Sequence, residues 1–180
     1  MPRIIDHDSR RRQILEDSLG LFSEEGYAGL GMRHLAKSLS VSTGTLYHYF
    51  PNKQSLFEAM LRHLAEDKVA EAMGQIEPTM NIDVRISIVQ AFMESQADHI
   101  RQALWVAIDF RRNTGTAADT LILEVLNVYK QALAAQLTDG DTERAEALLS
   151  YVIGVLVHSG LQEKSGPLFD ELGAIVKAVR

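Results

Sequence analysis

The segment between Ser42 and Pro51 constrains the fold of this chain more than any other part of the sequence. Ser42 is suited to cap a helix, because its hydroxyl can accept a hydrogen bond from an N–H two or three residues further on. Val41 and Leu46 have the spacing of a hydrophobic staple around that cap. Pro51 has no N–H and disfavours helical geometry at Phe50, so the helix ends after about two turns. A helix this short must be held by neighbouring helices.

Two further helices are predicted before this segment. The first spans about Ser9 to Glu25, with an apolar stripe and Gly26 at the left-handed position that ends a helix. The second spans about Met32 to Leu39 and is joined by a tight turn to the Ser42 helix. Together these three short helices predict a helix-turn-helix.

The small residues of the first turn after Ser42 are typical of a helix that enters a major groove of DNA. The chain beyond Pro51 is predicted to be helical throughout. A long helix begins at Asn52 and reaches about Gln75, and Glu77-Pro78 marks the clearest boundary in the sequence. Further helices are expected at about 83–99, 101–112, 118–137, 142–162 and 167–179. We see no alternating pattern of useful length that would indicate strands.

The predicted fold is therefore all-α. A helix-turn-helix domain is expected over residues 1–52, and a helical regulatory and dimerisation domain over 53–180, with helix 53–75 as the connector.

Composition excludes several classes of function. The 180-residue chain has no cysteine, so disulfides, cysteine-based zinc sites and thiol catalysis are excluded. The histidines form no HExxH or similar pairing, so no metal or other cofactor is expected, and the absence of a nucleophile–base motif argues against an enzyme. The N-terminus lacks a signal-peptide pattern. The longest apolar run, 148–157, is shorter than the roughly 20 residues that cross a bilayer, so a cytoplasmic protein is expected.

The charge distribution is uneven along the chain. The net charge is −6, yet residues 1–55 carry seven Lys and Arg against six Asp and Glu, which leaves +1 in that segment and −7 in the remainder. Arg10, Arg11 and Arg12 lie near the start of the first helix. They are expected either to contact phosphates or to form a solvated helix start. An acidic remainder is compatible with a local basic face and discourages DNA from binding elsewhere.

Residues across 14–61 form a pattern that resembles the TetR (tetracycline-repressor-like) family of bacterial transcriptional regulators. The matching positions include Leu21-Phe22, Gly26-Tyr27, Leu35-Ala36, and above all the run 44–50 followed by Lys53. The resemblance implies a DNA-reading N-terminal domain, and a C-terminal domain that dimerises and binds a small-molecule effector. In the family-implied mechanism, a repressor is released from a palindromic operator when the effector moves the connector helix. Gly31 departs from the pattern, because the family usually has Ser or Thr there, and the chain loses one side-chain phosphate contact.

The candidate DNA contacts lie in and around the second and third helices. Lys53 is expected to clamp a phosphate, because a cation in the first turn opposes the helix dipole unless an anion binds beside it. Arg33 is a candidate for a guanine contact, with a surface salt bridge as the alternative, whereas Tyr49 and Phe50 are expected to pack. The full set of predicted DNA-binding residues is Arg33, Ser42, Thr43, Gly44, Thr45, Tyr47, His48 and Lys53.

The last two predicted helices have the composition of an interface. Residues 148–157 are apolar nearly all round, which predicts cover on more than one side, by a second copy or by the chain's own core. The predicted dimer residues are Tyr151, Gly154, Val155, His158, Leu168, Leu172, Ile175 and Val179. Effector-binding candidates, each with a core role as the alternative, are Gln96, His99, Trp105, Tyr129 and His158.

Overall fold

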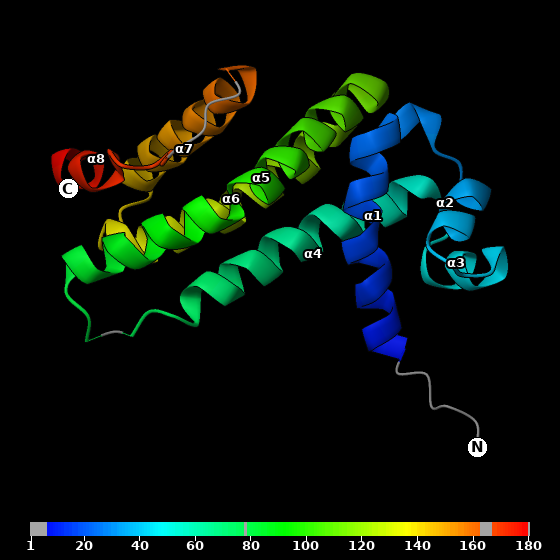
Figure 1. Cartoon of the computed structure of the whole chain (residues 1–180), viewed down its shortest axis with the longest axis horizontal. Helices are drawn as coiled ribbons and strands as arrows, with labels where there is room; N and C mark the ends of the chain where they lie inside the picture. Colours follow the sequence, from blue (N-terminus) through cyan, green and yellow to red (C-terminus); the bar gives the residue numbers. More distant parts are fainter. Residues whose placement is uncertain (1–6, 78, 163–166, 180) are drawn as a thin grey trace. The chain divides into compact units, whose positions relative to one another are not determined.

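The computed structural model describes residues 7–77, 79–162 and 167–179, and these residues form helices with no strand among them (Figure 1). The all-α prediction is confirmed. In chain order the elements are α1 (His7–Gly29), α2 (Met32–Ser38), α3 (Thr43–Tyr49), α4 (Lys53–Met73), α5 (Ile82–Thr114), the 3₁₀ turn η1 (Gly115–Ala118), α6 (Asp119–Leu137), α7 (Thr142–Gln162) and α8 (Leu172–Val179).

The chain divides into two compact units. One contains residues 1–64 with 102–123, and the other contains 65–101 with 124–180. This division differs from the expected boundary after residue 52, because the start of α4, the end of α5 and the start of α6 group with the helix-turn-helix. We refer to them below as the N-terminal unit and the C-terminal unit.

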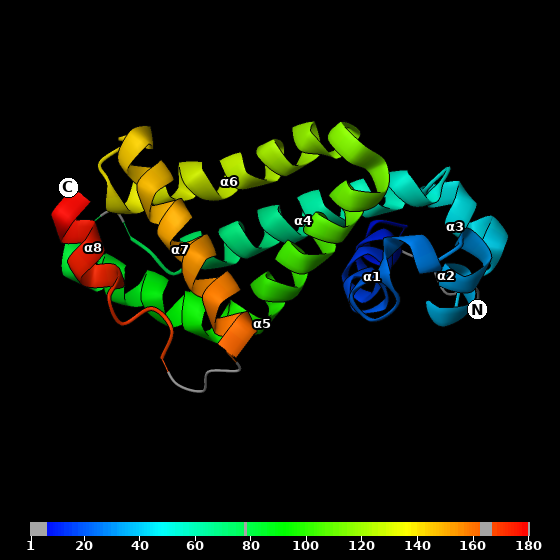
Figure 2. The same ribbon diagram turned by 90° about the horizontal axis from the view of Figure 1, so that it is seen from above.

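The N-terminal unit buries the apolar stripes that the sequence predicts. Helices α1, α2 and α3 lie together in both views (Figure 2). The predicted end of α1 is confirmed at Gly26, whose φ of 72° interrupts the helix before a last turn that runs to Gly29. The core side chains of these helices and of the start of α4 are Ile14, Leu15, Leu19, Phe22, Leu35, Leu46, Leu56, Phe57 and Met60, each at most 2% exposed.

The C-terminal unit has its own core, to which α5, α6, α7 and α8 contribute. Its buried members include Met93 from α5, Leu137 from α6, Leu148 and Leu156 from α7, and Phe169 just before α8. Helix α7 is long and apolar enough to cross a membrane by length and composition, but a third of that stretch is buried inside the protein. Its apolar character therefore serves at least partly to build this core, as the alternative interpretation of 148–157 allowed.

Two predicted helix limits are wrong. A single helix, α5, runs through 82–114 where two helices were expected, because residues 99–101 contain neither glycine nor proline and the i,i+3 pair of Asp98 and Arg101 spans the expected break. Helix α8 begins at Leu172 rather than at Pro167, and the N–H groups of Leu168 and Phe169 before it donate to the Glu94 carboxylate, at 2.6 Å each. The predicted boundary residue Pro78 lies outside the described residues.

Candidate nucleic-acid interface

Helix α3 is built as its sequence predicts. The Ser42 hydroxyl accepts a hydrogen bond from the N–H of Thr45 at 2.9 Å and shares a second bond with the Thr45 hydroxyl at 2.7 Å. Leu46 is fully buried, and Phe50 leaves helical geometry just before Pro51. Cap, apolar anchor and proline thus define a helix of seven residues in a fixed orientation.

The outward edge of α3 carries the predicted contact residues. Ser42, Gly44, Tyr47 and His48 are exposed, with Tyr47 at 49%, while Thr43 and Thr45 are half-buried. A side chain on Gly44 would meet only the Ser42 hydroxyl, at 3.8 Å. The edge therefore combines a small first turn with an aromatic hydroxyl and an imidazole further along.

Helix α2 presents Arg33 on its exposed first turn. No ion pair of Arg33 is recorded within the described part of the chain, so the alternative of a surface salt bridge finds no support there. Gly31 occupies the N-cap position with extended geometry and no side-chain cap, and a side chain there would meet open space. The glycine therefore keeps the expected cap geometry without a hydroxyl.

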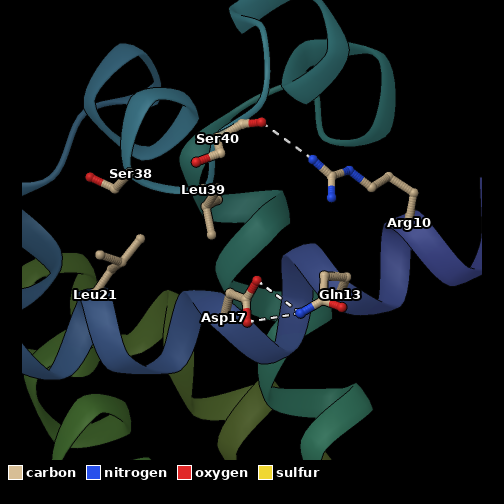
Figure 3. Close-up of a pocket in the computed structure, with 7 residues that line it drawn as sticks. All are labelled: Arg10, Gln13, Asp17, Leu21, Ser38, Leu39 and Ser40. Carbon is tan, nitrogen blue, oxygen red and sulfur yellow. Dashed lines mark hydrogen bonds between the residues drawn. The ribbon is translucent and has the colours of Figure 1, made fainter.

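Arg10 and Arg11 make contacts within the protein. The Arg10 guanidinium donates to the carbonyl of Ser40, at 3.3 Å, and Figure 3 shows it reaching from α1 toward the turn between α2 and α3. Arg10 and Ser40 line a cleft of about 310 Å³, in which the Gln13 side-chain amide also donates to the Asp17 carboxylate. The Arg11 guanidinium lies 5.3 Å from the centre of the Phe50 ring. Both side chains help to fix the helix-turn-helix on α1.

Tyr49 packs as predicted, and it does so beside the start of α1. The Tyr49 hydroxyl is hydrogen-bonded to Nδ1 of His7 at 3.0 Å. The His48 ring lies edge-on to the Tyr49 ring, with the ring centres 5.4 Å apart. Helix α3 is thus held by α1 at its end as well as at its turn.

Lys53 lies in a different environment from the one expected. Its ammonium donates to the carbonyl oxygens of Tyr27, at 2.5 Å, and of Leu30, at 2.8 Å, and lies 4.2 Å from the centre of the Tyr27 ring. Burial lowers the pKa of Lys53, while the two carbonyl oxygens and the ring face favour its charged form. The lysine thus ties the start of α4 to the last turn of α1 and to the loop that follows it, a role that the sequence did not predict.

Asp109 of α5 also contacts the last turn of α1. One of its oxygens, Oδ2, accepts from the Tyr27 N–H at 2.7 Å. Burial and the nearby Glu58 carboxylate both raise the pKa of the Tyr27 hydroxyl. Tyr27 and Asp109 are 82 residues apart, so no local pattern could have predicted the contact.

The five effector candidates do not share one environment. His99 and Tyr129 are half-buried in the C-terminal unit, and burial, together with Lys68, lowers the pKa of His99, whereas burial raises the pKa of Tyr129 to about 12. The Nε2 atom of His99 is buried without a hydrogen-bond partner. Trp105 is 41% exposed and belongs to the N-terminal unit, and the exposed His158 pairs with Gln162 at 2.9 Å. Gln96 is half-buried on α5, and its side-chain amide donates to the hydroxyl of the neighbouring Ser95.

Most of the candidate dimer residues pack partly against the core of the C-terminal unit, and only two of them are exposed. Gly154 and His158 are exposed on α7, and Tyr151, Val155, Leu168, Ile175 and Val179 are half-buried. Leu172 is fully buried in the chain's own core, so its placement in a dimer interface is wrong. The first residue of α8 points inward because it anchors that short helix. Burial and three carboxylates, those of Glu171, Asp170 and Glu94, raise the pKa of Tyr151.

Comparison with known proteins agrees with this geometry. The family described as bacterial regulatory proteins, tetR family, matches residues 14–60. The HTH-type transcriptional regulator PksA of Bacillus subtilis is 37% identical over 76 residues, but the match spans only 37% of that relative's length and 42% of this chain. The HTH-type transcriptional repressor AcnR of Corynebacterium diphtheriae is 25% identical, over 79% of this chain and 89% of AcnR.

Solved structures show the same fold over nearly the whole chain. The transcriptional regulator FadR from Bacillus subtilis, in complex with stearoyl-CoA, superposes with a TM-score of 0.75 and covers 93% of this chain and 96% of its own. At 17% identity this likeness establishes the fold alone. PksA and AcnR are both named as HTH-type transcriptional regulators, and neither name is that of an enzyme. Residues 14–60 of this chain thus match the tetR family of bacterial regulatory proteins, and the chain has the all-helical fold seen in the structure of FadR.

Proposed function

We propose that this protein is a ligand-responsive repressor that binds a palindromic operator as a homodimer and is released from it by a small-molecule effector. The observation that carries the proposal is the outward edge of α3, where Gly44, Tyr47 and His48 are exposed on a helix fixed by the Ser42 cap and the buried Leu46. An exposed, small first turn on a rigidly held short helix suits a major groove.

Within this proposal, the contacts divide into those that position the protein and those that read bases. Tyr47 and His48 supply hydrogen bonds to phosphates, and Lys53 can add one through the ammonium N–H that it does not donate to the Tyr27 and Leu30 carbonyls. Thr43 and Thr45 can touch thymine methyl groups. Arg33, exposed and outside any recorded ion pair of the described residues, is the best placed to bind a guanine through two hydrogen bonds.

The proposed dimer uses the outer sides of α7 and α8. Ser150, Gly154, His158 and Leu161 follow one another at helical spacing on α7, and all are exposed, with Leu161 at 72%. No atom of the described residues lies within 4 Å of the position that a Cβ on Gly154 would take, which leaves room for a second helix to approach closely. A two-fold dimer would present two copies of α3 about 34–36 Å apart, or a multiple of that distance, and so reads an inverted repeat.

The proposed effector site lies beside His99 of the C-terminal unit, with Gln96 one turn away on α5, and Tyr129 of α6 is a further candidate. The buried Nε2 of His99 has no hydrogen-bond partner among the described residues, and a ligand oxygen or N–H would satisfy it. An effector releases the operator only if it binds the two arrangements of the reading helices with different affinity.

The experiment is a gel shift with the purified protein and the DNA that flanks its own gene, at moderate salt, together with a mass measurement in solution. We expect sequence-specific binding and about twice the mass of one chain. Absence of any sequence-specific binding by the wild-type protein would overturn the regulator function, and a monomer at micromolar concentration would overturn the dimer.

A further inference from the structure

The corner between α1 and α2 is held by hydrogen bonds to both the N–H and the carbonyl of one residue, Tyr27. Gly26 turns the chain with its φ of 72°, and Tyr27 follows. The N–H of Tyr27 donates to Oδ2 of Asp109 at 2.7 Å, and its carbonyl accepts from Nζ of Lys53 at 2.5 Å. All of these residues belong to the N-terminal unit. Helices α4 and α5 therefore hold the backbone of this corner from two sides.

The side chain of Tyr27 adds apolar contacts to the same two helices. Its ring meets Phe57 of α4 edge-on at 5.3 Å and Phe110 of α5 edge-on at 4.9 Å. Phe57 and Phe110 are stacked on each other at 4.2 Å. Edge-on aromatic pairs have a preferred geometry, so the ring fixes the direction in which the chain leaves the corner.

The Asp109 carboxylate is itself oriented for this contact. The Asn113 side-chain amide donates to Oδ1 of Asp109 at 3.1 Å and to the backbone carbonyl of Asp109 at 2.8 Å. That leaves Oδ2 for the Tyr27 N–H, and a Cβ on Gly26 would lie 3.4 Å from the same Oδ2. A bond from a backbone N–H to a carboxylate is among the stronger hydrogen bonds in proteins.

We propose that Asp109 is a positioning residue for operator binding, which sets the place of α2 and α3 by holding the Tyr27 corner. The inference rests on the proposed function. Only four residues separate Tyr27 from the first residue of α2, and Lys53 ties the Leu30 carbonyl within that stretch. A shift of the corner therefore moves the start of α2 and, through the tight turn after it, the reading edge of α3.

The test uses the full-length variants Asp109→Ala and Asp109→Asn, with Asp98→Ala as the matched control. Asp98 is on the same helix and carries the same charge, but among the described residues it pairs with Arg101 instead of a backbone N–H of the α1–α2 corner. Two affinities are measured by fluorescence anisotropy. One is for the duplex most enriched by the wild-type protein from a random library, and the other is for an unrelated duplex of equal length. Hydrogen exchange of the Tyr27 amide is measured in the same proteins.

We expect Asp109→Ala to weaken specific binding at least tenfold, to change non-specific binding less than twofold, and to accelerate exchange at Tyr27. Asp109→Asn, which keeps an oxygen acceptor, should recover most of the specific binding, and Asp98→Ala should match the wild type. An Asp109→Ala protein that exchanges faster at Tyr27 yet keeps the wild-type ratio of specific to non-specific affinity overturns the inference, as does an unchanged exchange rate. Failure of the wild-type protein to enrich any duplex would instead overturn the proposed function. The wild-type experiment alone therefore separates failure of the proposed function from failure of the inference about Asp109.

Discussion

Replacement of Lys53 by methionine separates two roles that this side chain can have at the DNA interface. Methionine keeps an unbranched apolar stem that can lie on the Tyr27 ring, but it removes the ammonium that donates to the Tyr27 and Leu30 carbonyls. If the ammonium holds the corner, the variant loses stability and specific binding. If it clamps a phosphate, the variant loses affinity for every DNA sequence.

The magnitude follows from the contacts. A hydrogen bond from a charged donor contributes about 1.5–3 kcal/mol, and two are lost, but Lys53 is only half-buried and water replaces part of both. Removal of a cation from the first turn of α4 returns about 0.3–1 kcal/mol. We expect a net loss of about 2 kcal/mol, which for a chain of this length lowers Tm by about 4–8 °C.

The assay is thermal unfolding followed by DNA binding over a range of salt concentrations, with Lys37→Met as the control. Lys37 is exposed in the last turn of α2, so that variant loses the same charge without the two carbonyl bonds. A positioning role predicts a lower Tm, weaker specific binding and an unchanged slope of log K against log salt. An unchanged Tm, with a slope smaller by about one unit per subunit and equal losses on all sequences, would refute the positioning role and support the phosphate clamp.

Three further predictions follow from named contacts. Ser42→Ala removes the acceptor for the Thr45 N–H and should cost about 1 kcal/mol of unfolding free energy, measured by urea titration; a loss below a few tenths would show that the cap contributes little. Gly31→Ser places a hydroxyl in open space at the start of α2 and should strengthen binding to all duplexes. The slope of log K against log salt should not change, because a neutral phosphate contact releases no counterion. Unchanged affinity would show that the start of α2 does not lie at the DNA backbone. His99 has a pKa below its ordinary value in the folded protein, so the unfolded chain binds more protons near and below pH 6.5, and stability should fall as pH decreases through that range; in His99→Gln the fall should be smaller, and an equal fall in both proteins would contradict the assignment.

Helix α3 could be predicted from the sequence because all of its determinants are local. The Ser42 cap, the buried Leu46 and the stop at Pro51 lie within ten residues, and each acts on its immediate neighbours. The same holds for the turn at Gly26, where one residue takes up a positive φ. Local rules of this kind identify the helix-turn-helix and its exposed edge.

The role of Lys53 could not be predicted, because its partners lie 23 and 26 residues away. Sequence indicates that a cation opposes the helix dipole at that position, but either a phosphate or a pair of carbonyl oxygens can compensate. The contact between Tyr27 and Asp109 depends on how α5 packs within the N-terminal unit. Such contacts become visible only when the packing of the helices is known.

The dimer residues illustrate a similar limit. Leu172 has the same helical spacing as Ile175 and Val179, yet it is fully buried while they are half-buried. Periodicity identifies an apolar helix, but it does not distinguish the side that faces the chain's own core from the side left for a second copy.

Selection of DNA from a random-sequence library by the wild-type protein tests the central claim most directly. If a homodimer reads DNA through two copies of α3, the enriched duplexes should contain an inverted repeat with half-sites one helical turn, or a small multiple of it, apart. A footprint on the best duplex should cover both half-sites with the same symmetry. Enrichment of a single unpaired half-site would contradict the dimeric mode of reading, and no enrichment at all would contradict sequence-specific regulation.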